Sequence, residues 1–321
     1  MSLKYFVRNI DEKNFNKIVD IVKNQNCVSF VGAGLSISKG YRSWQEVILG
    51  TQKKQKLVIH GLVQAVGKRL KDYSKSQRKD LYEIAQDCKA FAQELYEQFI
   101  IKEFDRKNYK RNWDQTHYYV WKIPFLSILT TNFDPCLYDA GFEVLGKDPT
   151  VFTTGGFGIP LKKGNLYHIH GITIKTNPPI NNIKTIVLSK SEYNQAYSKN
   201  GSLYRFLTHV MQNHHLLFIG YSFKDRFFET LIDEIINILD EERRVAEEIH
   251  KIEFRLRDHY LMIRENEITS QREKMLKKYN IHIIKFTGVR EDYSSLLNLL
   301  IELYENVTDT KLPEPLIQKL F

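Results

Sequence analysis

Four short segments of the sequence, at positions 32–36, 131–134, 170–171 and 220–225, contain glycine and polar residues, and each directly follows an apolar run. Short apolar runs that end in such residues are typical of buried strands. In an open parallel sheet, ligands bind beyond the carboxyl ends of the strands. We therefore expect the four segments to lie at one edge of a sheet and to build a single site.

The first segment contains Gly32, Ala33, Gly34 and Ser36, a composition that lets backbone amides approach a pyrophosphate at the start of a helix. A dehydrogenase would place a third glycine at position 37, where this chain has Ile37. It would also end a second strand with an acidic residue about 20 residues later, and the sequence has none there. The segment thus predicts a dinucleotide site and disfavours hydride transfer. A tight turn without a ligand is the alternative.

The second and third segments supply side chains for chemistry. Asn132 and Asp134 would face the same side of an extended chain, and their alternative role is a turn or a helix cap. His168 and His170 also share a strand face, which raises a metal site as an alternative. The sequence marks no third ligand, so no metal is expected. Gly171 leaves room beside the imidazole of His170, which favours His170 as the exposed histidine.

The fourth segment contains Gly220, Ser222 and Asp225. The spacing of the serine and the aspartate is typical of the capped N-terminus of a helix. Because anions also bind at helix N-termini, capping and ligand binding are compatible here.

The elements that must position these segments alternate along the chain. Apolar positions 15, 18, 19 and 22 predict an amphipathic helix, and helical periodicity recurs over residues 77–104, 231–239 and 293–304. Five apolar runs predict strands at 27–31, 124–130, 165–170, 215–219 and 281–286. Strands separated by helices predict an α/β fold, a Rossmann-like doubly wound parallel sheet with a helical insertion after the first strand at about residues 42–121.

The composition is that of a globular protein, with 42% hydrophobic and 26% charged residues. The first ten residues lack the apolar block of a signal peptide, and no run approaches the ~18 apolar residues of a membrane span. Cys27, Cys88 and Cys136 lie far apart without a CxxC pair, which argues against a disulfide framework and a four-cysteine zinc site. These features predict a cytoplasmic protein.

The net charge of +9 is concentrated in residues 51–80, where nine Lys or Arg residues face two acidic ones. Such a segment can attract a polyanion or steer an anionic dinucleotide. A solvated helical face is the favoured interpretation. Because no aromatic residues alternate with these lysines, nucleic-acid binding is not expected.

In this order the four segments resemble the sirtuin-like (silent information regulator two) family. The family's glycine-alanine-glycine-x-serine loop, threonine-x-asparagine-x-aspartate strand end, histidine-glycine pair and glycine-x-serine turn are matched at 32–36, 130–134, 170–171 and 220–222. Trp44 matches the glycine-x-x-x-tryptophan continuation of the bacterial branch. The resemblance covers about residues 26–300. It implies a single NAD-binding domain over residues 1–305, followed by a tail at 306–321.

The resemblance also implies residue roles. Asn132, Asp134 and His170 would line the nicotinamide-ribose pocket. The other residues expected to contact NAD are Gly32, Ala33, Gly34, Ser36, Trp44, Thr131, Gly220, Ser222 and Asp225. Deacetylases of the family carry a four-cysteine zinc module after the histidine-glycine pair, and this chain has no cysteine after Cys136. The chain is therefore more similar to bacterial sirtuin-like domains that hydrolyse NAD in antiviral defence.

We expect NAD to be the substrate and to be cleaved at its nicotinamide–ribose bond. Asn132 would orient water or a ribose hydroxyl, Asp134 would place negative potential beside the cationic centre, and His170 would take up a proton. Transfer of ADP-ribose or deacylation in the same pocket, and a non-catalytic NAD-sensing module, remain as alternatives.

An enzyme of this kind needs control, because free NAD hydrolysis would drain its own cell. We expect a homo-oligomer or a gating partner, such as an ATPase or an Argonaute-like protein, and no membrane contact. The helical insertion and the tail beyond Val307 are the surfaces expected to meet such partners.

Overall fold

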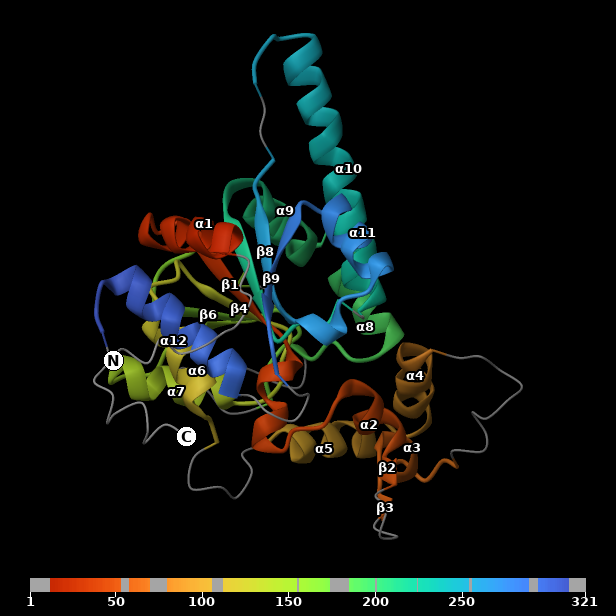
Figure 1. Ribbon diagram of the computed structural model, residues 1–321. Coiled ribbons are helices and arrows are strands. Elements are labelled where there is room, and N and C mark those ends of the chain that lie inside the picture. Colours follow the sequence, from red (N-terminus) through yellow and green to blue (C-terminus); the bar gives the residue numbers. More distant parts are fainter. Residues whose placement is uncertain are drawn as a thin grey trace.

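A seven-stranded parallel sheet forms the centre of the molecule (Figure 1). The computed structural model describes residues 12–52, 58–69, 80–105, 112–154, 156–173, 185–199, 201–223, 225–253, 256–288 and 294–311. All neighbouring strands of the sheet are parallel. Their spatial order is β5 (Thr150–Phe152), β6 (Asn165–His168), β4 (Ile128–Thr130), β1 (Cys27–Val31), β7 (His215–Ile219), β8 (His259–Arg264) and β9 (Ile281–Phe286).

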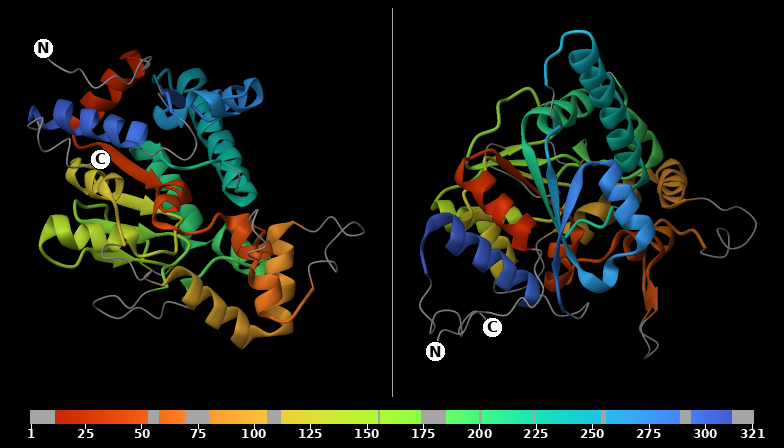
Figure 2. Two further views of the ribbon diagram at one scale, coloured as in Figure 1. Left: turned by 60° about the horizontal axis from the view of Figure 1, so that its bottom comes forward. Right: turned by 45° about the horizontal axis from the view of Figure 1, so that its top comes forward.

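Helices cover both faces of the sheet (Figure 2). Successive residues of β1 point to opposite faces, so that Val31 and Phe30 belong to two different hydrophobic clusters. The cluster with Val31 includes α1 (Glu12–Lys23), α6 (Gln115–Lys122), α7 (Cys136–Leu145) and α12 (Ser294–Thr308). The cluster with Phe30 includes α9 (Ser202–Asn213), α10 (Arg226–Glu248) and α11 (Ser270–Lys278). The predicted doubly wound α/β fold is confirmed.

The order of the strands reverses at β1. β4 and β6 follow on one side, whereas β7, β8 and β9 follow on the other. Val31 pairs with both Thr130 and Ile219, and Thr130 pairs with His168. The carboxyl ends of four strands therefore lie in one row, at the switch point where open α/β sheets bind ligands.

Short helices and one hairpin lie between β1 and α6. They are η1 (Ala33–Leu35), η2 (Ile37–Lys39), α2 (Trp44–Leu49), β2 (Thr51–Gln52), β3 (Val58–Ile59), α3 (Leu62–Ala65), α4 (Leu81–Phe91) and α5 (Gln93–Phe104). The guanidinium of Arg42 forks onto Glu103, with contacts of 2.9 and 2.6 Å, and ties the start of this segment to α5. Helix α4 of this segment packs against α8 (Lys190–Ala196), which follows β6.

The prediction of one helix over residues 77–104 is wrong. Ala92, with φ −153° and ψ 77°, separates α4 from α5. The bend turns Phe91 and Leu95 outward, where they are 62% and 46% exposed. Neither glycine nor proline marks the break, so apolar periodicity could not show it. Residues 77–79 lie outside the described part of the chain.

The five predicted strands are present, and three have the predicted bounds. β4 begins later than predicted, at Ile128, and β6 ends earlier, at His168. The sequence did not predict β5, a three-residue edge strand, or β8. α12 continues to Thr308, into the predicted tail, and residues 312–321 of that tail lie outside the described residues.

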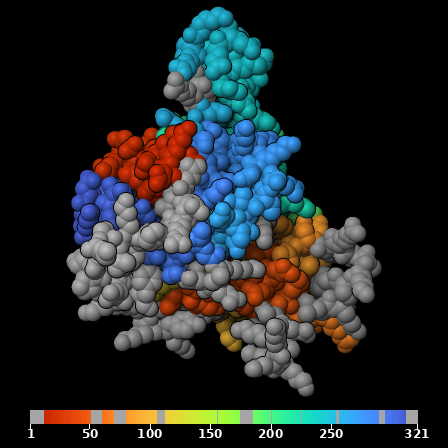
Figure 3. All heavy atoms as spheres, viewed as in Figure 1, coloured from red at the N-terminus to blue at the C-terminus, as the bar shows by residue number. Residues whose placement is uncertain are grey.

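The helix predicted at 231–239 is the middle of α10, which projects from the molecule. Its last described turns and the chain after them stand clear of the globular body (Figures 1 and 3). Ile249, just beyond the helix, is 68% exposed. The pairs Arg243–Asp240 and Arg244–Glu241, each three residues apart, link side chains along the projecting part.

Burial of His259 makes the stability of the sheet depend on pH. His259 begins β8, is 2% exposed, and accepts a hydrogen bond at Nδ1 from the amide of Leu216, at 3.1 Å. Burial, with a smaller effect of nearby His215, lowers the pKa of His259 to about 3. The unfolded chain binds this proton near pH ~6.5 and the folded chain does not. The free energy of unfolding therefore decreases as the pH falls below ~6.5.

We expect urea unfolding at pH 5.5 to give a lower free energy than at pH 7.0, by about 1 kcal/mol for His259 alone. His259→Asn keeps an acceptor for the Leu216 amide and removes the titrating group. This variant should lose less stability than the wild type between the two pH values. An equal loss in both proteins would contradict the role of His259.

Candidate functional site

The carboxyl ends of β1 and β7 are joined by their backbones at the switch point. The amide of Gly32 donates to the carbonyl of Ile219 and that of Gly34 to the carbonyl of Gly220, both at 2.9 Å. With β4 and β6 in register beside β1, the starts of the four predicted segments lie along one edge of the sheet. The structure thus brings together the strand ends that the sequence singled out.

Close backbone packing explains three glycines of the site. A Cβ at Gly32 or at Gly34 would lie 2.6 Å from the carbonyl oxygen of Gly220. Gly220 has φ +63°, and a Cβ there would lie 2.9 Å from the amide nitrogen of Leu35. From the sequence, these glycines were expected to allow the close approach of a pyrophosphate. In the structure, it is the approach of β7 that requires them.

The glycine loop does not start an α-helix as expected. It forms two 3₁₀ turns, η1 and η2, and the next α-helix begins only at Trp44. The amides of Gly32, Gly34, Leu35 and Ser36 already donate to carbonyls of the loop, of β7 or of Gly220 directly after it. The amide of Ala33 is not one of these donors, and Ala33 is exposed. A phosphate at this loop would therefore meet Ala33 rather than the open end of a helix.

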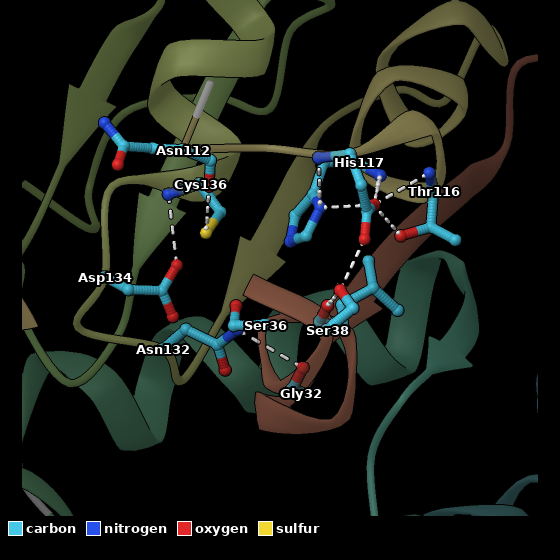
Figure 4. Close-up of polar contacts among 11 residues, drawn as sticks. Gly32, Ser36, Ser38, Asn112, Thr116, His117, Asn132, Asp134 and Cys136 are labelled. Atoms are coloured by element: carbon cyan, nitrogen blue, oxygen red, sulfur yellow. Dashed lines mark hydrogen bonds and ion pairs between the residues drawn. The ribbon is translucent and has the colours of Figure 1, made fainter. Parts of the chain in front are cut away.

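Asn132 lies directly against the glycine loop (Figure 4). Its Nδ2 donates to the carbonyl of Gly32 at 3.2 Å and to the hydroxyl of Ser36 at 3.1 Å. Its backbone amide donates to the hydroxyl of Thr130. The side-chain carbonyl of Asn132 is buried and has no hydrogen-bond partner among the described residues. An unpaired buried acceptor is costly, so this oxygen is a candidate contact for a ligand donor.

Asp134 is 4% exposed and lies at the start of α7 (Figure 4). One of its carboxylate oxygens accepts a hydrogen bond from the amide of Cys136 at 3.0 Å. This contact is the turn or cap that the sequence left open as its alternative. A role toward a ligand stays a prediction.

The two histidines do not share a strand face, because β6 ends at His168 and His170 lies in the following turn. His168 is fully buried, and its Nδ1 lies 2.8 Å from the carbonyl oxygen of Asn132. Burial lowers the pKa of His168 to about 4. His168 therefore positions the backbone of the Asn132 segment.

His170 is also buried, so the expectation of an exposed His170 is wrong. It is 2% exposed, and its Nε2 lies 2.5 Å from the hydroxyl of Tyr197. Burial lowers the pKa of His170 to about 3. Gly171 does not leave room beside the imidazole. It has φ +87°, and a Cβ there would lie 2.5 Å from the carbonyl oxygen of Thr185.

An aromatic group that the sequence did not predict connects His170 with Trp44. The ring of Tyr193 lies 5.1 Å from that of His170 and 4.6 Å from that of Tyr82, and Trp44 packs 5.7 Å from Tyr82. Trp44 Nε1 is buried without a partner among the described residues. The tyrosines come from α4 and α8, which carry no recognisable motif, so spacing could not reveal them.

Asp225 anchors this aromatic group. It caps α10 by accepting from the amides of Phe227 and Phe228, and it also accepts from the hydroxyls of Tyr82 at 3.0 Å and Tyr193 at 3.3 Å. Burial raises its pKa above the usual value. Its carboxylate is thus occupied by four protein donors.

Ser222 and Thr131 are less integrated than the sequence implied. Ser222 is exposed, and its carbonyl accepts a hydrogen bond from Arg272 at 2.7 Å. The helix cap predicted for the Ser222–Asp225 spacing is made by Asp225 itself. Thr131 is half-buried between β4 and Asn132.

A polar cluster on the other side of the glycine loop was also missed (Figure 4). Asp114 accepts hydrogen bonds from the hydroxyls of Ser38 and Thr116, and His117 Nδ1 lies 2.8 Å from it. Burial alone would raise the pKa of Asp114, but the contacts with His117, Ser38 and Thr116 hold it well below the usual value. His117 is fully buried, and its Nε2 has no partner among the described residues. His117 therefore adds to this cluster a buried ring nitrogen that is unpaired within the described ranges.

Residues 126–284 match the family model of the SIR2-like domain. This part of the chain is thus similar to the SIR2-like domain. The matched region contains Asn132, Asp134, His170 and Gly220, whereas the glycine loop lies before it. The resemblance to the sirtuin-like family that the sequence indicated is confirmed.

Curated proteins that this chain resembles are named NAD(+) hydrolase ThsA. The protein of that name from Enterococcus faecium is 24% identical over 299 residues, which are 88% of this chain and 55% of the relative. The one from Bacillus cereus (strain MSX-D12) is 23% identical over 312 residues, which are 92% of this chain and 56% of the relative. This chain thus spans about half the length of these curated relatives. A solved structure from work on the mechanism and regulation of Sir2 enzymes is 14% identical, with a TM-score of 0.42, and the match covers 94% of this chain and 100% of that one.

No group of three or more His, Cys, Asp or Glu side chains in the described ranges is arranged to hold a metal ion. No described helix is long and apolar enough to cross a bilayer. Half of the basic segment at 51–80, with seven of its nine Lys or Arg residues, lies outside the described residues.

We expect Gly34→Ala to disrupt the site by overpacking, because its Cβ would press on backbone rather than on a flexible side chain. The free energy of unfolding should fall by about 1–3 kcal/mol, measured by urea denaturation. Gly158→Ala is the matched control, since a Cβ at Gly158 meets no atom within 4 Å. Equal stability of the two variants would contradict this account of the loop.

Proposed function

We propose that this protein hydrolyses NAD to nicotinamide and ADP-ribose. The observation that carries the proposal is the buried contact of Asn132 with Gly32 and Ser36 at the switch point, with an unpaired carbonyl left on Asn132. The names of the relatives, NAD(+) hydrolase ThsA, support NAD as the substrate.

The chemistry needs little acid catalysis. Nicotinamide leaves NAD as a neutral molecule from a cationic centre, so its departure requires no proton. The protein must hold the ribose, stabilise a carbon with oxocarbenium character and direct water to the opposite face. In our proposal, Asn132 orients the ribose or the water, and Asp134 adds negative potential beside the cationic carbon.

His170 would be the proton acceptor. Burial keeps its imidazole neutral at pH 7, because the pKa of about 3 lies far below that pH. A neutral imidazole has one ring nitrogen free to accept a proton from water or from a ribose hydroxyl. The residue can serve only when a substrate or a water molecule, rather than Tyr197, occupies that nitrogen.

Deacylation is disfavoured because the chain has no cysteine after Cys136 and therefore no four-cysteine zinc module. Transfer of ADP-ribose to a macromolecule would use the same pocket with another nucleophile. The assay of the products distinguishes it from hydrolysis. As a setting we propose antiviral defence in the cytoplasm, with activity gated by homo-oligomerisation or by a protein partner. We also propose that residues 1–305 form a single domain, with the helical insertion at about 42–121 and a tail at 306–321.

We expect Asn132→Ala and His170→Ala each to lower kcat/KM for NAD by about 10²–10⁴-fold, the contribution typical of a positioned catalytic group. Chromatography of the products would follow nicotinamide and ADP-ribose. Asn306→Ala and His209→Ala are matched controls on exposed helix positions, and they should retain wild-type turnover.

Two results would count against hydrolysis. The first is no release of nicotinamide by the wild type, alone or with candidate partners. The second is label from NAD that accumulates on a protein or a nucleic acid while no free ADP-ribose forms, which would favour the transferase.

A further inference from the structure

α8 encloses the imidazole of His170. Tyr197, one residue beyond the helix, places its hydroxyl 2.5 Å from Nε2 of His170. The rings of Tyr193 and Tyr197 stack on each other, with centroids 5.7 Å apart, and both meet the imidazole edge to face. The ring of Phe133 also lies 6.4 Å from that of the imidazole. The result is a histidine that solvent does not reach.

The contact with Tyr197 uses the lone pair that the proposed reaction needs. Burial raises the pKa of the Tyr197 phenol well above its usual value, so the hydroxyl keeps its proton and donates it to Nε2. A neutral imidazole has a single acceptor nitrogen. A ribose hydroxyl or a water molecule must therefore displace the phenol before His170 can accept a proton from it.

We propose that Tyr197 is a latch that holds the site closed, and that NAD is admitted when α8 moves away from His170. The inference rests on the proposed function and adds its regulation. It makes Tyr197 a residue that restrains His170 rather than one that assists the chemical step.

Polar contacts with α4 and α5 hold α8 in the closed position. Glu192 of α8 pairs with Lys89 at 2.7 Å and accepts from the hydroxyl of Tyr96 at 3.1 Å. Lys190 pairs with Glu83 at 2.6 Å. α4 and α5 belong to the segment between β1 and α6, which lies outside the sheet. Tyr193 of α8 also donates to Asp225 at 3.3 Å, so the release of His170 requires this bond to break together with the contacts to α4 and α5. The contact of Asn132 with the glycine loop can stay in place.

Tyr197→Phe tests the latch, because it removes the hydroxyl and keeps the ring. Reaction of His170 with diethyl pyrocarbonate at pH 7, measured peptide by peptide with mass spectrometry, reports access to the imidazole without any need for turnover. A net hydrogen bond corresponds to about 3- to 10-fold in an equilibrium, so we expect His170 to react about 3- to 10-fold faster in the variant. The kcat/KM for NAD should rise by a similar factor.

Three controls accompany this variant. Tyr204→Phe makes the same chemical change on the neighbouring helix α9 and should leave both readouts at wild-type values. His168, fully buried behind Asn132, should stay unreactive throughout. Lys89→Met removes the ion pair with Glu192 and leaves the surroundings of His170 unchanged. It should raise both readouts about twofold. It therefore tests the latch independently, should Tyr197→Phe fail to fold.

A fall of kcat in Tyr197→Phe with unchanged labelling of His170 would overturn the latch, since Tyr197 would then assist the reaction. Unchanged labelling and unchanged turnover would overturn it as well. If no variant releases nicotinamide while His170 still reacts faster in Tyr197→Phe, the latch stands and the proposed hydrolysis fails. The two ideas are therefore separable in one experiment.

Discussion

The pairing of two backbones at the switch point is the constraint on which the site depends. The amide of Gly34 donates to the carbonyl of Gly220. The two segments could not approach so closely if a Cβ stood at Gly32, Gly34 or Gly220. This pairing fixes the loop that presents Ser36 to the amide of Asn132. The backbone pairing of two strand ends thus sets the geometry of a side chain from a third strand end.

Several buried polar side-chain atoms have no hydrogen-bond partner among the described residues. The carbonyl of Asn132, Nε2 of His117 and Nε1 of Trp44 are all unpaired among the described residues. Each such group costs about 1–3 kcal/mol relative to a paired one. Asn132 lies against the glycine loop, so its unpaired carbonyl is placed to meet a polar ligand there. It contrasts with His170, whose nitrogen is already paired with Tyr197.

The sequence predicted the fold and the main strand ends because short apolar runs, helical periodicity and glycine or polar residues after strands have direct physical causes. It placed Asn132, Asp134 and the glycine loop together, as they are found. It could not predict that Ala92 breaks a regular apolar pattern, since no residue there forbids a helix. It also missed Tyr82, Tyr193 and Tyr197, because only the folded chain brings α4 and α8 beside His170.

The central place of β1 in the sheet has a consequence for the order in which the molecule can be made. Thr130 of β4 follows Val31 of β1 by 99 residues, and His214 before β7 follows its contact Asn26 by 188 residues. Pairings so distant along the chain form slowly, and an unpaired buried strand is prone to aggregate in the meantime. A growing chain therefore carries β1 without its second partner, β7, until Ile219 has been synthesised. No unfinished chain shorter than this can contain the assembled site.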